Sequence, residues 1–291
     1  MIISSKGKKH IDGHKELTAH KEILDLSNDE DVCREVYFPI VAPNGKEMQV
    51  LVKENDAVKV GTVLCKREDF YVPVYSSVSG KVKEIKSMYN SALGRACNHL
   101  VIENDFKYES KLLTKYDYKK ESKEKLLEAL KESGMVGLGG AGFPTYVKYS
   151  STASINSLLV NAVECEPYLT TDYVTIKENI NYLLEGIQIL LKISEAKEAV
   201  IAFKNNKKDL KEMLDKELVN YPNVRIFEVK DKYPMGWEKL LVKTVFKKNY
   251  DKLDVHFDLW KKESDAQPYI PDMVQKMKDQ GFAYEDQGAL V

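Results

Sequence analysis

Short runs in which apolar and polar residues alternate fill the chain between about residues 36 and 105. Examples are VYFPIVA, MQVLVKEND, YVPVYSSVSGKVKEI and HLVIEN, with Gly, Asn-Asp and Ser-Gly residues between runs. Alternation with a period of two, punctuated by turn-forming residues, is typical of short β-strands. The pattern therefore predicts a small all-β unit in the first part of the chain.

A different pattern begins near residue 119. The segment KKESKEKLLEALKES, residues 119–133, predicts a charged amphipathic helix with leucines on one side. Further on, the apolar runs SLLVNAVE, AVIAFK and VRIFEV alternate with helices predicted over about 171–196, about 206–218 and from about Gly236. This alternation favours a parallel sheet with covering helices, and such sheets bind ligands at the carboxyl ends of their strands.

A glycine-rich stretch, GLGGAGFPTYVK, lies between the amphipathic helix and the first of these runs. It holds four glycines within six residues, Gly137, Gly139, Gly140 and Gly142. Glycines let consecutive backbone N–H groups converge on an anion, and a helix N-terminus that follows adds positive potential. The stretch predicts a phosphate cradle within reach of the Lys148 ammonium, with a flexible turn as the alternative interpretation.

The segment VNAVECEPYLTTDY begins as a buried type of strand and becomes acidic where that strand should end. Asn161, Glu164 and Glu166 lie at this end, and Pro167 stops the strand. Polar groups at the carboxyl edge of a parallel sheet are candidates for hydrogen bonds to sugar hydroxyls or ring nitrogens. Two glutamates alone would favour solvated rim residues, but the preceding glycine stretch favours a binding cleft.

Composition excludes several classes of protein. With 291 residues, 43% of them hydrophobic, the chain suits about two domains with real cores. A net charge of -1 gives no basic field for nucleic acid or an anionic membrane. The start lacks the apolar core of a signal peptide, and no stretch approaches the roughly 20 apolar residues of a membrane span. Four scattered cysteines without a CxxC pair predict neither a disulfide framework nor a metal site, zinc or iron–sulfur, built by this chain alone.

Three motifs resemble a known family in their order and spacing. They are GLGGAGFPTYVK, VNAVECEPYLTTDY and KYPMGWEKLL. Together they resemble the RnfC family, the NADH-facing subunit of Rnf-type electron transport complexes, and the similar electron transfer proteins associated with proline reductase. The glycine motif also resembles that of the flavin-bearing subunit of respiratory complex I. The resemblance includes the N-terminal DGHKELT and covers about residues 8–252.

The first part of the chain carries a second resemblance. The halves VKENDAVKVGTVL and VPVYSSVSGKVKEI resemble the barrel-sandwich hybrid fold of lipoyl and biotinyl domains. In those domains a lysine at a hairpin carries the swinging cofactor, and Asp69 stands in that place here. Because a carboxylate cannot form the amide link, we expect an unmodified structural or docking module.

These resemblances imply an α+β multidomain chain. A lipoyl-like, all-β barrel-sandwich hybrid domain would be followed by an α/β, Rossmann-like domain that binds FMN and NADH, and then by a short helical tail. The predicted boundaries are 1–35 for an N-terminal segment, 36–115 for the barrel-sandwich domain, 116–253 for the FMN/NADH domain and 254–291 for the tail.

The family also implies roles for individual residues, with FMN against the glycine stretch and NADH stacked on the flavin. Glu166 would meet the nicotinamide side as the catalytic residue. The residues that would hold the flavin and its phosphate are Gly137, Gly139, Gly140, Gly142, Phe143, Lys148, Asn161, Glu164, Gly236 and Glu238. Leu138 and Val163 depart from the complex I pattern, which has an arginine and an aspartate at these positions. No metal ligand is expected.

The end of the chain departs from the family. RnfC proteins continue with a segment that binds 4Fe-4S clusters, and the four scattered cysteines of this chain do not form the CxxC runs that would ligate them. Residues 254–291 resemble instead an internal fragment of arginyl-tRNA synthetase, which predicts a chimera. The residues leave open whether this segment is native, engineered or an assembly join.

The function implied is an electron transfer subunit that accepts a hydride from NADH through FMN and passes electrons toward iron–sulfur clusters, ferredoxin or a reductase. The expected partners are NAD(H) and the other subunits of an electron transport complex or a reductase, with no nucleic acid. We expect a cytoplasmic protein that is peripheral to the membrane only through its partners. The alternative is a non-catalytic docking or assembly module with a vestigial flavin cleft.

Overall fold

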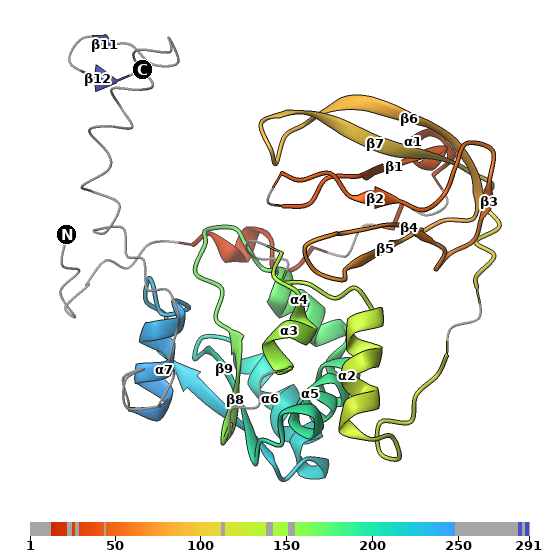
Figure 1. Ribbon diagram of the computed structural model, residues 1–291. Coiled ribbons are helices and arrows are strands. Elements are labelled where there is room, and N and C mark those ends of the chain that lie inside the picture. The colour runs from red at the N-terminus through yellow and green to blue at the C-terminus, as the bar shows by residue number, and fades with distance from the viewer. Residues whose placement is uncertain are drawn as a thin grey trace. The chain divides into compact units, whose positions relative to one another are not determined.

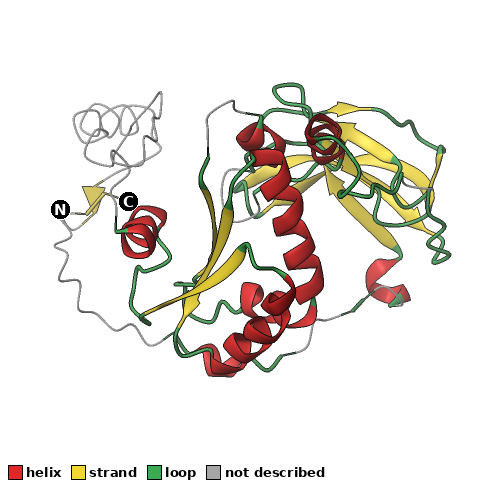
Figure 2. Cartoon of the chain, turned by 90° about the horizontal axis from the view of Figure 1, so that it is seen from below, coloured by secondary structure: helices red, strands yellow, loops and turns green. Residues whose placement is uncertain are grey.

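The computed structural model describes residues 13–21, 25–26, 29–43, 45–111, 114–137, 142–150, 155–247, 285–286 and 289–290. The chain divides into two compact units, Met1–Trp237 and Glu238–Val291. The first unit contains an all-β part followed by a part of mixed helix and strand. Figure 2 draws helices in red and strands in yellow.

Two small antiparallel sheets form the all-β part (Figure 1). The first sheet has the strand order β1 (Glu35–Pro39), β7 (Arg95–Asn104), β6 (Gly80–Asn90), β3 (Ala57–Val58). The second has the order β2 (Gln49–Val50), β4 (Val63–Lys66), β5 (Pro73–Tyr75). Apolar residues of both sheets share one core, which includes Val58, Leu64, Val82, Leu100 and Ile102. The all-β unit predicted from residues 36–105 is therefore confirmed, although burial does not alternate strictly along its strands: the four consecutive residues 99–102 of β7 are all buried.

Two short helical elements precede the first strand of the all-β part. They are the 3-10 helix η1 (Lys15–Leu17) and the helix α1 (Glu30–Cys33). The Asp29 carboxylate accepts hydrogen bonds from the backbone N–H groups of Asp31 and Val32, so it caps α1 at its N-terminus.

Helices and parallel strands alternate in the second part. The elements are α2 (Lys123–Glu132), α3 (Thr145–Tyr149), β8 (Ser157–Ala162), α4 (Thr171–Glu178), α5 (Ile180–Ser194), β9 (Glu198–Lys204), α6 (Lys208–Glu217), the 3-10 helix η2 (Leu218–Asn220) and β10 (Val224–Val229). The strands form a parallel sheet in the order β10-β9-β8. The parallel sheet predicted from the alternation is therefore confirmed.

Helices α4, α5 and α6 cover one face of this sheet. Leu158, Val160 and Ala162 of β8 face the same side as Ala199, Ile201 and Phe203, their partners in β9. These residues pack with Ile176, Leu184, Leu191, Leu210 and Leu214 of the three helices. Strand β9 is the central strand and is buried along most of its length, which explains its uninterrupted apolar run.

The helix predicted over about 171–196 consists of two helices. Asn179 separates α4 from α5 with φ -130° and ψ 34°, outside the helical region. The apolar periodicity continues across this break because Ile176 and Ile180 both reach the same core.

The second unit contains helix α7 (Glu238–Phe246), in which Leu241 and Val245 are buried. It also contains two short antiparallel strands, β11 (Glu285–Asp286) and β12 (Ala289–Leu290). The helix predicted within the tail lies outside the described residues. The predicted domain boundaries remain predictions.

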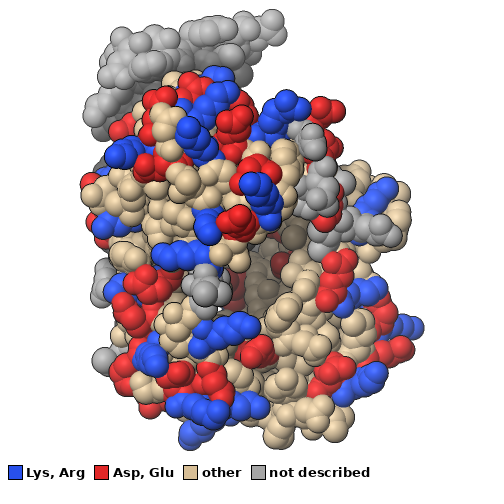
Figure 3. All heavy atoms as spheres, turned by 90° about the vertical axis from the view of Figure 1, so that its right-hand side faces the viewer, with Lys and Arg blue, Asp and Glu red and all other residues tan. Residues whose placement is uncertain are grey.

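Within the described part of the chain, no helix is long and apolar enough to cross a membrane. The same residues contain no group of three or more His, Cys, Asp or Glu side chains that could hold a metal ion. All four cysteines are free thiols. Figure 3 shows basic and acidic side chains interspersed over one face of the molecule, in keeping with the balanced net charge.

Candidate functional site

The described ends of the glycine stretch are tied to each other. The Gly137 N–H donates to the Phe143 carbonyl at 3.0 Å, and the Thr145 N–H donates to the Met135 carbonyl at 2.9 Å. Val136 and Pro144 form an isolated antiparallel bridge between the same two segments. The two ends of the stretch that the structure describes therefore lie side by side and close its base. Gly139 and Gly140, two of the predicted flavin contacts, lie outside the described residues.

Gly142 has a backbone conformation that other residues rarely adopt. Its φ is +62°, and a Cβ at this position would come within 2.7 Å of Pro43 Cγ. Glycine is therefore required at position 142 for both backbone conformation and space.

Lys148 lies in the last turn of α3, directly after this loop. Its side chain is exposed, and none of the described residues pairs with its ammonium. An uncommitted cation one helical turn from a closed glycine loop is available for an anionic ligand.

The carboxyl end of β8 brings three predicted residues to one edge of the sheet but distributes them over its two faces. Because side chains alternate along a strand, Asn161 faces away from the helix-covered side on which Val160 and Ala162 pack. Glu164 lines a pocket on the helix-covered side, together with Ala162 and Tyr173. Glu166 follows on an exposed segment, where its carboxylate accepts a hydrogen bond from the Cys165 N–H at 3.2 Å.

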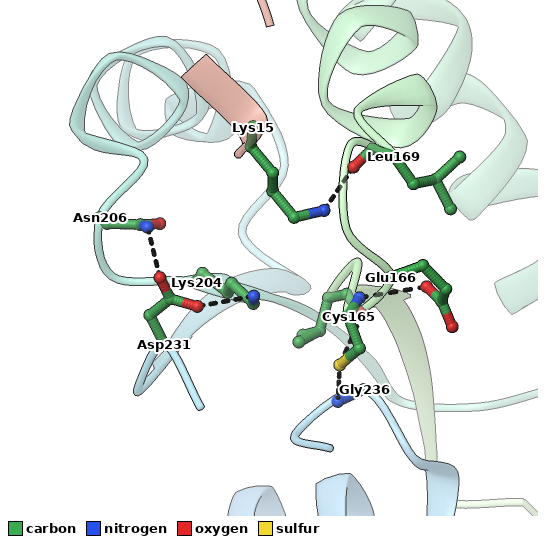
Figure 4. A network of polar contacts seen from close by, with 9 residues as sticks. Lys15, Cys165, Glu166, Leu169, Lys204, Asn206, Asp231 and Gly236 are labelled. Atoms are coloured by element: carbon green, nitrogen blue, oxygen red, sulfur yellow. Dashed lines mark hydrogen bonds and ion pairs between the residues drawn. The ribbon is translucent and has the colours of Figure 1, made fainter. Parts of the chain in front are cut away.

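Asn161 and Cys165 hold a loop that comes from far along the sequence. The Asn161 amide donates to the Gly236 carbonyl at 2.9 Å, and its oxygen accepts from the Val163 N–H at 3.1 Å. The Gly236 N–H in turn points at Cys165 Sγ, 2.9 Å away (Figure 4). Asn161 and Gly236, which are 75 positions apart in the sequence, are thus in direct contact. Glu238 begins α7 in the second unit.

Glu164 is almost fully buried, with 8% of its surface exposed. Its carboxylate accepts a hydrogen bond of 2.7 Å from the Asp172 N–H in the first turn of α4. Burial raises the pKa of Glu164 and lowers the pKa of Lys15, while the attraction between the two charges opposes both shifts. Glu164 is therefore a buried carboxylate that anchors the start of a helix.

The N-terminal segment lies against the loop that follows Glu166. Lys15 donates to the Leu169 carbonyl, as Figure 4 shows, and the Thr18 hydroxyl donates to the Tyr168 carbonyl at 2.8 Å. The Tyr168 N–H returns a hydrogen bond to the Gly13 carbonyl at 2.6 Å. This short segment thus fixes the loop next to the predicted catalytic glutamate.

The ends of β9 and β10 carry an ion pair at the same edge of the sheet. Lys204 Nζ lies 2.6 Å from the Asp231 carboxylate, and Asn206 donates to the other oxygen of that carboxylate at 2.8 Å (Figure 4). Lys204 is buried, so its charge is balanced within the protein.

Sequence patterns do not indicate Lys15, Cys165 or Arg67 as site residues. Arg67, in the connection between β4 and β5, donates to the Gly142 carbonyl across 75 positions of sequence. Each of these residues contacts a segment far away in the sequence. The spacing of residues along the chain does not predict such contacts. The resemblance to a lipoyl-type hairpin around Asp69 is the sequence feature that could have drawn attention to Arg67, two residues earlier.

Comparisons with known proteins identify two consecutive domains. A family model described as the RnfC barrel-sandwich hybrid domain matches residues 3–107, and one described as the Nuo51 FMN-binding domain matches residues 130–261. The second match covers the glycine stretch, the end of β8 and Gly236. It also extends past the expected join near residue 253, and the resemblance of residues 254–291 to arginyl-tRNA synthetase has no support from these comparisons.

Curated relatives agree with these matches. The chain is 33% identical over 247 residues to the C subunit of the proton-translocating ferredoxin:NAD(+) oxidoreductase complex of Clostridium ljungdahlii, which covers 83% of this chain and 53% of the relative. It is 33% identical over 211 residues to the C subunit of the ion-translocating oxidoreductase complex of Pasteurella multocida, covering 71% of this chain and 25% of the relative. The chain thus spans about half or less of the length of these relatives.

Among solved structures, the NAD+-reducing [NiFe]-hydrogenase in its air-oxidized state aligns with 42% of this chain and 23% of its own, at 23% identity and a TM-score of 0.39. The family models and the curated relatives indicate the same family, and the two matched domains follow each other along the sequence. The chain therefore belongs to the RnfC family, and it joins an RnfC barrel-sandwich hybrid domain to an FMN-binding domain of the complex I type.

Proposed function

We propose that this chain binds FMN between its glycine stretch and the carboxyl end of β8, and that it is the NADH-oxidising part of an electron transfer complex. The observation that carries the proposal is the match of an FMN-binding domain model over residues 130–261, which includes both groups of residues. When bound, FMN supplies a ring that accepts a hydride and releases electrons singly.

The described residues at the glycine stretch fit an anionic flavin nucleotide. Gly142 takes a conformation reserved for glycine, and the loop is closed at its base by the Gly137–Phe143 hydrogen bond. The ammonium of Lys148, which pairs with none of the described residues, provides a positive charge after the loop. We assign Gly137, Gly142, Phe143 and Lys148 to the phosphate and ring of the flavin.

The end of β8 supplies the polar side chains of the proposed site. Asn161, held by Gly236, has a second amide hydrogen left to donate to a ligand on its exposed side. Glu166 is exposed at the carboxyl edge of the sheet, and we assign it to the nicotinamide side, where its carboxylate would orient the dinucleotide. Gly236 completes the flavin contacts that we assign. Glu164 is buried on the other face of the sheet, where it anchors the start of α4, so its flavin role, like that of Glu238, stays a prediction from the family resemblance.

The relatives are named as subunits of ferredoxin:NAD(+) and ion-translocating oxidoreductase complexes. We propose by extension that this chain takes electrons from NADH and delivers them to 4Fe-4S clusters held by partners, in an assembly on the cytoplasmic face of a membrane.

The proposal is tested by adding FMN to the purified protein, removing free flavin and adding NADH in the absence of oxygen. We expect the visible absorbance of the bound flavin to bleach. Glu166→Gln should retain FMN but bleach more slowly, whereas Glu185→Gln, an exposed glutamate on α5, should match the wild type. Failure of the wild-type protein to retain FMN would refute the proposal.

One observation favours a second function, that of a docking module with a vestigial cleft. Both ends of the Asn161 amide already bind the backbone of the protein, and Val163, which stands where complex I has an aspartate, is buried with 6% exposure. A fluorescence titration separates the two functions, because a docking module would leave FMN fluorescence unquenched at every protein concentration.

A further inference from the structure

A buried arginine of the barrel-sandwich domain contacts the glycine stretch. Arg67 follows β4 and is 8% exposed. Its Nη1 donates to the Gly142 carbonyl at 2.9 Å, in a hydrogen bond that is buried at both ends. A hydrogen bond from a charged donor to a carbonyl is stronger than a neutral one, and its loss leaves a buried acceptor without a partner.

Asp69 fixes the orientation of this guanidinium. Arg67 Nε and Nη2 donate to the two carboxylate oxygens of Asp69 at 2.8 and 2.6 Å, so the pair is bidentate. The Arg67 hydrogen bond lowers the pKa of Asp69 to about 2, and the carboxylate therefore stays charged at neutral pH. With two of its edges held by Asp69, the planar guanidinium directs Nη1 at Gly142 with little loss of side-chain entropy.

Two further contacts hold the same end of the stretch. The Phe70 ring meets the Phe143 ring edge to face, with 5.8 Å between centroids. Pro43, from a separate turn of the barrel-sandwich domain, occupies the space that a Cβ of Gly142 would fill. Because the Phe143 carbonyl accepts from the Gly137 N–H, holding Phe143 also fixes the start of the stretch.

We propose that Arg67 is a positioning residue for flavin binding: paired with Asp69, it holds the Gly142 carbonyl and so sets the backbone of the described ends of the glycine stretch and the start of α3. The inference rests on the proposed function. In lipoyl domains the corresponding hairpin carries the cofactor. In this chain, the inference gives that hairpin a different role: it holds the glycine stretch in place.

The test compares Arg67→Met, Arg67→Lys and Asp69→Asn with a matched control, Arg95→Met. Arg95 is an exposed arginine of the same domain that also donates to a glycine carbonyl, that of Gly45, at 2.9 Å. We expect the FMN dissociation constant, measured by fluorescence quenching, to rise about tenfold in Arg67→Met. Arg67→Lys and Asp69→Asn should fall between this variant and the wild type, and Arg95→Met should match the wild type.

Hydrogen exchange of the proteins without flavin provides a second readout. In Arg67→Met the amides of residues 142–149 should exchange faster, while those of β8 and β9 keep wild-type protection. Wild-type FMN affinity together with wild-type exchange in Arg67→Met would overturn the inference. Faster exchange throughout both domains would also overturn it, since Arg67 would then act on folding in general. If the wild-type chain binds no FMN, the proposed function fails, and the exchange of residues 142–149 still decides whether the clamp exists.

Discussion

Gly236 occupies a position at which no side chain fits. A Cβ there would lie 2.1 Å from the Val163 carbonyl oxygen and 2.9 Å from Cys165 Sγ. The first of these atoms belongs to the backbone, so the clash cannot be relieved by a change of rotamer. The glycine of the KYPMGWEKLL motif is therefore explained by the close approach of its loop to the end of β8.

Gly236→Ala should destabilise the protein by about 1–3 kcal/mol, because the added methyl group must displace backbone. Gly186 is the matched control: it lies in α5, and a Cβ there meets nothing within 4 Å. Gly186→Ala should stabilise the helix by about 0.5–1 kcal/mol. Urea denaturation measures both changes, and equal stability of Gly236→Ala and the wild type would show that the loop does not pack as described.

Glu164 should make stability depend on pH in a defined direction. Its pKa is raised from the usual 4.5 by burial, so the folded state holds this proton more tightly than the unfolded state. The contribution of this carboxyl to stability is therefore largest below pH 4.5 and is lost as the pH rises through the folded-state pKa. Glu164→Gln, measured by urea denaturation from pH 4.5 to neutrality, should remove this decline. A variant whose stability follows the wild-type curve would contradict the assignment.

The positions of some individual site residues can be predicted from the sequence, and those of others cannot. The polar residues at the end of the run SLLVNAVE do lie at the carboxyl end of a parallel strand, as predicted. The contacts of Lys15 and Arg67 join segments that are 154 and 75 positions apart in the sequence. Spacing along the chain reports neighbours within one element, and it carries no information about such contacts.

For whole elements, the apolar periodicity predicts the presence of strands and helices better than it predicts their ends. The run AVIAFK is β9, the central strand, which is buried along most of its length and therefore needs an unbroken apolar run. The run VRIFEV is β10, an edge strand, in which exposed Arg225 and Glu228 interrupt the apolar residues. The break between α4 and α5 at Asn179 does not show in the sequence, since the apolar side chains on both sides of it reach one core. A break in backbone dihedrals that leaves the buried face continuous gives no signal in a hydrophobic pattern.

Helix α5 should depend on its buried face for stability. Leu184 is fully buried between the helix and the sheet, and Leu184→Ala should cost about 2–5 kcal/mol of unfolding free energy. Tyr182, two positions earlier, is 75% exposed, and Tyr182→Ala should change stability by less than about 0.5 kcal/mol. Chemical denaturation with a secondary-structure probe distinguishes the two, and similar losses for both variants would contradict the packing of α5 on the sheet.

At the scale of the whole first unit, the two folded parts are joined by specific polar contacts. Tyr71 of the barrel-sandwich domain donates to the Glu132 carboxylate at 3.0 Å, and the Tyr75 hydroxyl donates to the Glu132 carbonyl. Glu132 ends α2, which precedes the glycine stretch. Together with the Arg67–Gly142 hydrogen bond, these contacts indicate that the barrel-sandwich domain supports the glycine stretch rather than acting as a separate carrier module.

FMN binding at the glycine stretch is the property on which the proposed function depends. A titration of FMN fluorescence with the purified chain tests it most directly, with Lys148→Ala as the variant and Lys197→Ala, a lysine at the opposite end of the sheet just before β9, as the control. We predict saturable quenching at one flavin per chain, weakened by Lys148→Ala and unchanged in the control. Fluorescence that stays unquenched at saturating protein, or equal quenching by wild type and Lys148→Ala, would contradict the claim.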